Sequence, residues 1–330
     1  MEADSLLAQG LAGLARGTLE LTGSLDALVA SGEFIARDLA YRDVATPEVT
    51  GTFEWSNTDR RNVTATVASP LVQYGDMEFH RVDVGASGRP DSLTWSGQID
   101  VGTLSSISGG GLWWQPDSTQ WILQLDTLTA RLPAQRWRLI EPARISVAEG
   151  AIEVTGFEMR PFVGGARLYL DGEIPRGRPG ELRVEGYGID LRDVYGLIQR
   201  DTTGVTGTLG VDLAIGGTSR EPTITGTMTL GDARFGDFQA PFLQGVFNYE
   251  DRELDANLLL WRTGVQVLTV EARLPIDLGF TGVDERQLPG ELYVRAVADS
   301  VDLALLEAFT PSTREVEGLL KADVEILGSW

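Results

Sequence analysis

Gly207-Thr-Leu-Gly-Val-Asp-Leu-Ala-Ile-Gly-Gly217 is the stretch that decides the fold predicted for this chain. Its apolar residues alternate with small or polar residues, which is typical of a β-strand with one apolar and one polar face. The pattern returns near the end of the chain, where Gly318 and Gly328 lie 111 residues after Gly207 and Gly217. The strand is therefore one copy of an internal repeat.

The segment that follows this strand has an earlier copy. Matching residues are separated by a constant 194 positions, without a gap. The matches pair Gly23, Gly32, Asp38, Asp43, Pro47, Gly51 and Phe53 with Gly217, Gly226, Asp232, Asp237, Pro241, Gly245 and Phe247. The sequence leaves two candidates, Gly13 and Gly17, for the counterpart of Gly207.

Further matches relate the middle of the chain to its last third. Residues 168–175 match residues 268–275 at an offset of 100, and residues 179–184 match residues 289–294 at an offset of 110. The increase predicts about ten inserted residues in a turn of the later copy, at residues 276–287.

Short alternating runs between glycines fill most of the chain, and with the repeats they predict an extended all-β architecture of stacked homologous segments. We expect one continuous section over residues 1–330. Its approximate repeat units are 1–130, 131–206 and 207–317, and residues 318–330 begin a further unit.

Three places carry a helix pattern. Asp190 is a candidate N-cap for a short helix over residues 191–198, whose apolar residues have helical spacing. Asp302 introduces its later copy, which ends before Pro311. Residues 5–14 have the spacing of a short amphipathic helix. We therefore expect a few short helices beside the strands.

Composition excludes several classes of function. The net charge of −21 argues against nucleic acid as a partner, because phosphates would be repelled. The chain has no cysteine and a single histidine, His80, which we interpret as a surface or hydrogen-bonded residue. Gly109-Gly-Gly111 beside Trp113 and Trp114 predicts a flexible turn covered by core tryptophans.

No motif for catalysis, metal binding or cofactor binding is present. The sequence lacks a phosphate-binding loop, a nucleophile elbow, a dinucleotide fingerprint and a zinc-protease helix. Acidic residues such as Asp212 and Glu291 are dispersed on the polar phase of strands, so nothing selects a carboxylate pair for glycoside hydrolysis. We predict no catalytic residues, no metal, no cofactor and no enzymatic activity.

The apolar phase of the strands has two interpretations. In a sandwich it packs against a second sheet. In a single sheet curled on itself it lines a trough that could hold an acyl chain without fixing its position, because hydrophobic attraction is non-directional. The candidate lining residues are Leu168, Leu170, Leu182, Val184, Leu209, Val211, Leu213, Ile215, Val324 and Ile326.

The order of several segments resembles the TamB family of translocation and assembly module proteins, within the AsmA-like group. The segments are Trp137-Arg-Leu-Ile-Glu-Pro-Ala-Arg, Gly165-Ala-Arg-Leu-Tyr-Leu-Asp-Gly, Ile189-Asp-Leu-Arg-Asp-Val-Tyr, Gly207 to Gly226 and Val246-Phe-Asn-Tyr. The resemblance covers essentially the whole chain and is best from about residue 130 onward.

This resemblance implies an elongated, curled repeat β-sheet, described as a β-taco or repeating β-groove, with an apolar interior. It implies a periplasmic location with an inner-membrane anchor, and phospholipid transport between the inner and outer membranes. It also implies an Omp85-type outer-membrane barrel as partner in protein assembly. The family's membrane helix and partner-binding domain have no counterpart in these residues, so we interpret the chain as an internal section.

Two hypotheses follow from different classes of function. In the first, the chain is a section of a passive conduit whose partners are phospholipid acyl chains. In the second, free strand edges pair with client strands by β-augmentation and the chain is an assembly scaffold.

Overall fold

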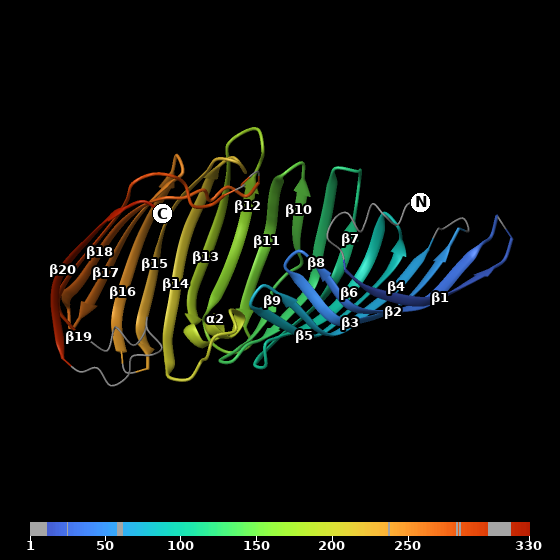
Figure 1. Cartoon of the computed structure of the whole chain (residues 1–330), viewed down its shortest axis with the longest axis horizontal. Coiled ribbons are helices and arrows are strands. Elements are labelled where there is room, and N and C mark those ends of the chain that lie inside the picture. Colours follow the sequence, from blue (N-terminus) through green and yellow to red (C-terminus); the bar gives the residue numbers. More distant parts are fainter. Residues whose placement is uncertain are drawn as a thin grey trace. The chain divides into compact units, whose positions relative to one another are not determined.

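The computed structural model describes residues 12–24, 26–57, 62–236, 238–281, 283, 285–302 and 318–330. Over these residues the chain is all-β, as predicted, with antiparallel strands and the short helix α2 (Figure 1). It forms two compact units. The first unit comprises Met1–Pro142 and Tyr195–Asp201, and the second comprises Ala143–Val194 and Thr202–Trp330.

The first unit contains nine of the described strands, and each pairs antiparallel with the next along the chain. They are β1 (Ala12–Thr22), β2 (Val29–Tyr41), β3 (Val44–Ser56), β4 (Val63–Tyr74), β5 (Met77–Arg89), β6 (Ser92–Val101), β7 (Ser105–Trp114), β8 (Gln120–Arg131) and β9 (Arg136–Leu139). Short glycine, proline and aspartate turns join them, which is why successive strands become neighbours in the sheet.

The second unit contains eleven described strands, and each pairs antiparallel with the next along the chain. They are β10 (Ala143–Ala148), β11 (Ala151–Pro161), β12 (Arg167–Ile174), β13 (Gly180–Asp190), β14 (Val205–Gly217), β15 (Pro222–Phe235), β16 (Phe238–Glu250), β17 (Glu253–Arg262), β18 (Val265–Pro275), β19 (Leu292–Asp302) and β20 (Leu319–Gly328). Figure 1 shows β11 to β15 side by side in chain order.

A glycine bulge marks the repeated strand in the structure. Gly207 has φ +118°, and the β14–β15 register shifts at this residue, opposite Asp232, whose φ is +48°. Gly13 has φ +134°, and the β1–β2 register shifts there opposite Asp38, whose φ is +51°. Gly318, with φ +131°, immediately precedes β20. The counterpart of Gly207 is therefore Gly13, not Gly17, because only glycine adopts these angles readily.

Helix α2 (Leu191–Leu197) forms where the sequence predicts it. The Asp190 carboxylate accepts a hydrogen bond of 2.9 Å from the Arg192 backbone N–H, so Asp190 is the N-cap. The segment Tyr195–Asp201 belongs to the first unit. There Gln199 bonds both backbone groups of Glu78, as acceptor at 2.8 Å and as donor at 2.7 Å.

Two local predictions need correction or fall outside the described residues. Gly109–Gly111 is not a turn but part of β7, where a Cβ on Gly111 would lie 1.9 Å from the Gln124 carbonyl oxygen. The three glycines therefore give room for close strand pairing, which sequence reasoning mistook for a loop signal. The amphipathic helix predicted over residues 5–14 is wrong for its last three residues, because β1 begins at Ala12. Residues 5–11 lie outside the described residues, and so does the helix predicted after Asp302.

Candidate functional site: one apolar face of the sheet

The strand register of the second unit gathers apolar residues into rows that cross the sheet on one face, called here the apolar face. In an antiparallel pair, directly opposite residues point to the same side. One row from β12 to β20 is Leu170, Val184, Leu213, Gly226, Phe247, Ala256, Ala272, Val294 and Ile326. The next is Leu168, Gly186, Val211, Met228, Gly245, Leu258, Val270, Ala296 and Val324.

The opposite side, called here the polar face, has a different composition. The row between the two apolar rows, one residue away from each on every strand, points to the polar face. It consists of Tyr169, Glu185, Asp212, Thr227, Val246, Asn257, Glu271, Arg295 and Glu325. Val246 is the one aliphatic residue in this row. The alternation of apolar and polar residues along each strand therefore gives one apolar and one polar face across nine strands. The sheet is amphipathic throughout this region.

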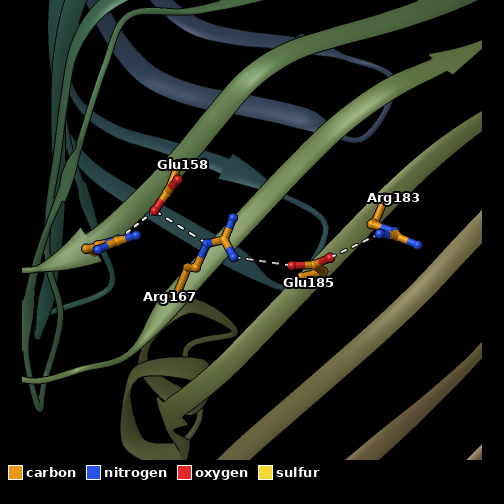
Figure 2. A network of polar contacts seen from close by, with 5 residues as sticks. Glu158, Arg167, Arg183 and Glu185 are labelled. Atoms are coloured by element: carbon orange, nitrogen blue, oxygen red, sulfur yellow. Dashed lines mark hydrogen bonds and ion pairs between the residues drawn. The ribbon is translucent and has the colours of Figure 1, made fainter.

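An ion-pair network on the polar face links β11, β12 and β13 (Figure 2). Arg167 lies between Glu158 and Glu185, at 3.4 Å from each, and Arg183 lies 3.6 Å from the other oxygen of Glu185. Arg160 also pairs with Glu158. Half-exposed pairs of this kind contribute little stability singly, but they keep this face hydrated and charged.

All ten residues predicted to line a groove lie on the apolar face. Leu168 and Val211 share one row with Val324, and Leu170, Val184 and Leu213 share another with Ile326. Leu182 and Ile215 are directly paired in a third row, and Leu209 belongs to a fourth row with Leu230. The register therefore brings together the residues that the sequence singles out. Their contact with a lipid stays a prediction.

Most of these side chains are only half-covered. Val324 is 49% exposed and Ile326 is 53% exposed, while Leu209, Val211 and Leu213 are half-buried. The side chains between the two sheets of a sandwich would be removed from water. The apolar face of the second unit is thus largely a surface rather than the inside of a two-layer core.

One end of this face is closed by the insertion that the sequence places at residues 276–287. Residues 276–291 join β18 to β19, and their backbone bonds Ser219: the N–H groups of Phe280 and Thr281 both donate to its carbonyl. Tyr249, only 1% exposed, binds the N–H of Leu278 through its hydroxyl. Arg286 holds the same loop by donating to the Asp277 carbonyl at 3.0 Å.

A small core lies beside this closed end. Val154, Ile174 and Leu182 are buried together, with Leu170 and Ile215 packed against them. Leu182 is 9% exposed and is the one of the ten predicted residues that is buried. The sequence predicted the length of the inserted loop but contained no signal for what the loop covers.

The first unit has the same two-faced organisation. One apolar row is Gly32, Phe53, Ala65, Ala86, Trp95, Gly111 and Leu125, and another is Ala30, Trp55, Val63, Gly88, Leu93, Trp113 and Leu123. The row between them is Ser31, Glu54, Thr64, Ser87, Thr94, Leu112 and Gln124. The sequence analysis did not include these aromatic residues among the candidate lining residues. The alternation of Phe53 and Trp55 with Glu54 is the signal that could have identified them.

Two hollows lie on the polar side of the first unit. The larger, of about 900 Å³, crosses β1 to β7 and has Thr18, Thr52, Thr66 and Ser96 along its walls. The smaller, of about 640 Å³, includes His80, Arg81, Asp100, Arg131 and Arg136. Both are lined mainly by polar-face residues, so neither coincides with the apolar face.

The titratable groups with perturbed pKa values form structural pairs. The Arg192 side chain lowers the pKa of Asp190 by hydrogen bonding to it, and the Arg295 side chain does the same for Asp323. Thr119 lowers the pKa of Asp117 in the β7–β8 turn. Within the described ranges no three His, Cys, Asp or Glu residues gather to hold a metal ion. His80 lies 3.5 Å from Glu78.

Comparison with known proteins gives one match. The family model described as TamB, N-terminal domain, matches residues 2–330. No curated protein and no solved structure matches the chain. Among the described residues no helix has the length and hydropathy needed to cross a membrane.

Proposed function

The chain belongs to the TamB family of cell-envelope proteins, and on that premise we propose that it is a section of a passive hydrophobic conduit for phospholipids between the inner and outer membranes. Acyl chains lie along the apolar face, and headgroups stay in water. The full-length protein is then periplasmic and anchored in the inner membrane.

The observation that carries this proposal is the half-exposed state of a continuous apolar face. Rows of apolar residues and glycines cross nine strands of the second unit, and residues such as Leu213 and Val211 remain half-buried. An apolar surface of this extent on a soluble domain normally marks a partner or a ligand. An acyl chain fits because contact with the face needs no fixed polar anchor.

The free energy of burying an acyl chain on this face is large enough to retain the chain and still lets it move along the face. Burying one CH₂ group contributes roughly 0.8 kcal/mol, so about 16 carbons gain on the order of 10 kcal/mol at full burial. Neighbouring positions along the face offer similar side chains, such as Leu213 beside Val211. A bound chain can therefore move between them at little change in free energy.

The acidic surface supports the same function. The chain carries 48 acidic and 27 basic residues. Anionic bilayers repel such a surface, which keeps the section from adhering to the membranes that it connects.

Native mass spectrometry of the purified chain tests the proposal. We expect co-purified phospholipid on the wild-type chain and its loss in Leu213→Asp, because a carboxylate on the apolar face is costly beside an acyl chain. Ala214→Asp is the matched control: it introduces the same group on the same strand but on the polar face, opposite Arg183. Repeated recovery of lipid-free wild-type protein from membranes, or equal loss in both variants, would contradict the conduit.

The second candidate is a scaffold for outer-membrane protein assembly with an Omp85-type barrel. Among the described strands, β1 pairs only with β2, and all eleven of its residues are exposed. Such an edge presents unpaired N–H and C=O groups to an incoming strand.

Successive N–H groups of an edge strand point alternately toward its partner and away. Proline at Thr18 and proline at Leu19 therefore remove one inward and one outward donor. The variant that loses the outward N–H keeps its pairing with β2 and should be the better folded of the two. The scaffold hypothesis predicts that this variant no longer binds an unfolded barrel strand but still binds its lipid. If that variant still binds the client strand, the scaffold is wrong.

A further inference from the structure

The polar face of the second unit carries a hollow of about 440 Å³ that crosses β16 to β19. Two neighbouring rows of the register supply its polar and aromatic side chains. The first row is Asn248, Asp255, Arg273 and Tyr293, and the second contributes Asn257 and Glu271. Ligand sites typically combine an apolar surface with a few placed polar groups, and this lining offers both.

The two asparagines of the hollow have amide groups available for a ligand. Asn248 and Asn257 are exposed, and in the part of the chain that the structure describes neither side-chain amide is bonded to another residue. Each amide offers two N–H donors and one carbonyl acceptor. Such groups suit a ligand whose own groups both donate and accept, as hydroxyl groups do.

The charges around the hollow favour a neutral ligand. The Nε atom of Arg273 lies 3.0 Å from the Asp255 carboxylate, so its charge is compensated within the protein. Glu271 is exposed and adds a negative charge. Arg295, which is opposite Glu271, is held by Asp323 at 2.8 Å. Phosphates and carboxylates therefore find no excess of positive charge here.

Two further aromatic rings lie on the same face. Phe242 and Trp261 are directly opposite each other on β16 and β17, with ring centroids 5.4 Å apart. Phe242 is 41% exposed, and the residue opposite it on β15 is Gly231, which has no side chain to cover the ring. Phe242 and Asn248 are six residues apart on β16, so about 20 Å of the polar face separates them.

We propose that this strip of the polar face binds a neutral glycan chain, with Tyr293 in the hollow and the Phe242–Trp261 pair as its stacking surfaces. A pyranose ring has an apolar face of C–H groups, which stacks on an aromatic ring, and hydroxyl groups around its rim. The rim hydroxyls bond the amides of Asn248 and Asn257. A chain of several sugar units reaches from the hollow to the aromatic pair.

The glycan site goes beyond the lipid conduit and does not depend on it. It lies on the polar face, whereas the proposed acyl-chain surface is the apolar face. Leu213→Asp should remove co-purified phospholipid and leave glycan binding unchanged, because Leu213 points to the opposite side of the sheet. A loss of glycan binding in this variant would contradict a separate site.

Calorimetric titration of the purified chain with cellohexaose and with chitohexaose, two uncharged oligosaccharides, tests the site. We expect saturable binding of at least one of them, weakened about tenfold or more in Tyr293→Val, because the stacking ring is lost. Tyr293→Phe keeps the ring and should retain the affinity within about threefold.

Tyr187→Val is the matched control, since it removes an exposed tyrosine from β13 of the same unit. It should change the affinity less than about twofold. If neither oligosaccharide binds saturably to the wild-type chain, or if Tyr293→Val and Tyr187→Val weaken binding equally, the proposal is overturned.

Asn257→Ala decides the question if Tyr293→Val does not fold, because Asn257 is exposed and its replacement leaves the strand pairing intact. A threefold or greater loss of affinity supports the site, and unchanged affinity overturns it. Gln239→Ala is the control for a lost exposed amide on β16 and should leave binding unchanged.

The corresponding disaccharides, cellobiose and chitobiose, test whether the ligand is a chain. The hexasaccharide should bind about tenfold or more tightly than the disaccharide of its series, because it reaches both sets of rings. Trp261→Leu should remove this advantage. Equal affinities for the two lengths, or an advantage that survives in Trp261→Leu, would overturn a chain that spans the hollow and the aromatic pair.

Discussion

The hydroxyl of Tyr249 accepts a hydrogen bond of 2.8 Å from the backbone N–H of Leu278. This bond joins the apolar face of β16 to the loop that connects β18 and β19. Arg252 approaches the same loop, with Nε 3.5 Å from the Asp277 carboxylate. The apolar face of the second unit is thereby closed at this end by residues of its own chain.

Tyr249→Phe should loosen this closure. The Leu278 N–H would lose its acceptor at a site where Tyr249 is 1% exposed, and an unsatisfied buried donor costs about 1–3 kcal/mol. Urea unfolding should show the loss, and hydrogen exchange should show faster exchange at Leu278. Tyr187→Phe is the control, because Tyr187 is 73% exposed and should change neither measurement. Equal behaviour of the two variants would contradict a closing role for Tyr249.

Gly207→Ala should destabilise the chain by about 1–3 kcal/mol, because a non-glycine residue is strained at such a backbone angle. Its φ is +118°, and a Cβ would lie 2.6 Å from the Ala233 Cα. Gly177→Ala provides the comparison: no atom lies within 4 Å of its added Cβ, so the change should stay below about 0.5 kcal/mol. Guanidinium unfolding of both variants measures the difference, and a tolerated Gly207→Ala would show that the bulge can be rebuilt.

Asp190 should make helix α2 sensitive to acid. The Arg192 side-chain hydrogen bond holds the pKa of Asp190 below its ordinary value of 3.8. A lowered folded-state pKa means that the contribution to stability is present above pH 3.8 and is lost as the pH falls through the folded-state pKa. Asp190→Ala should remove about 0.5–2 kcal/mol at neutral pH, as expected for a lost N-cap.

Asp190→Asn separates the cap from the charge. It retains an acceptor for the Arg192 N–H, so most of the capping should survive at neutral pH. The acid-dependent part of the stability should disappear. Unfolding curves from pH 7 to 2.5 for the three chains check this, and a wild type with the same acid profile as Asp190→Asn would refute it.

Gln199→Ala should release Tyr195–Asp201 from the remainder of the first unit. The Gln199 amide bonds both the N–H and the carbonyl of Glu78, and each such bond contributes roughly 1 kcal/mol. We expect faster hydrogen exchange at Glu78. Exchange at strands distant from this contact should be unaffected, and the exposed Gln239→Ala should leave Glu78 protected. Unchanged exchange at Glu78 would show that other contacts hold the segment.

Local patterns accounted for most of the secondary structure. Asp190 and the apolar spacing after it defined helix α2, because an N-cap and the first helical turn involve only neighbouring residues. Gly109–Gly111 misled because glycine serves both turns and close strand approach. Whether these glycines form a turn or allow close strand pairing depends on the neighbouring strand β8. Gln124 of β8 lies so close to Gly111 that a side chain there would clash.

The sequence alone determined that the strands are two-faced, since side chains alternate with a period of two. The strand register of the structure placed the ten named residues on one face. Tertiary structure alone decided that residues 276–291 close one end of the apolar face over Tyr249. It also decided that Gly13 is the bulge residue that matches Gly207. These relationships depend on where strands and loops pair across the fold, and alternation within one strand contains no information about that.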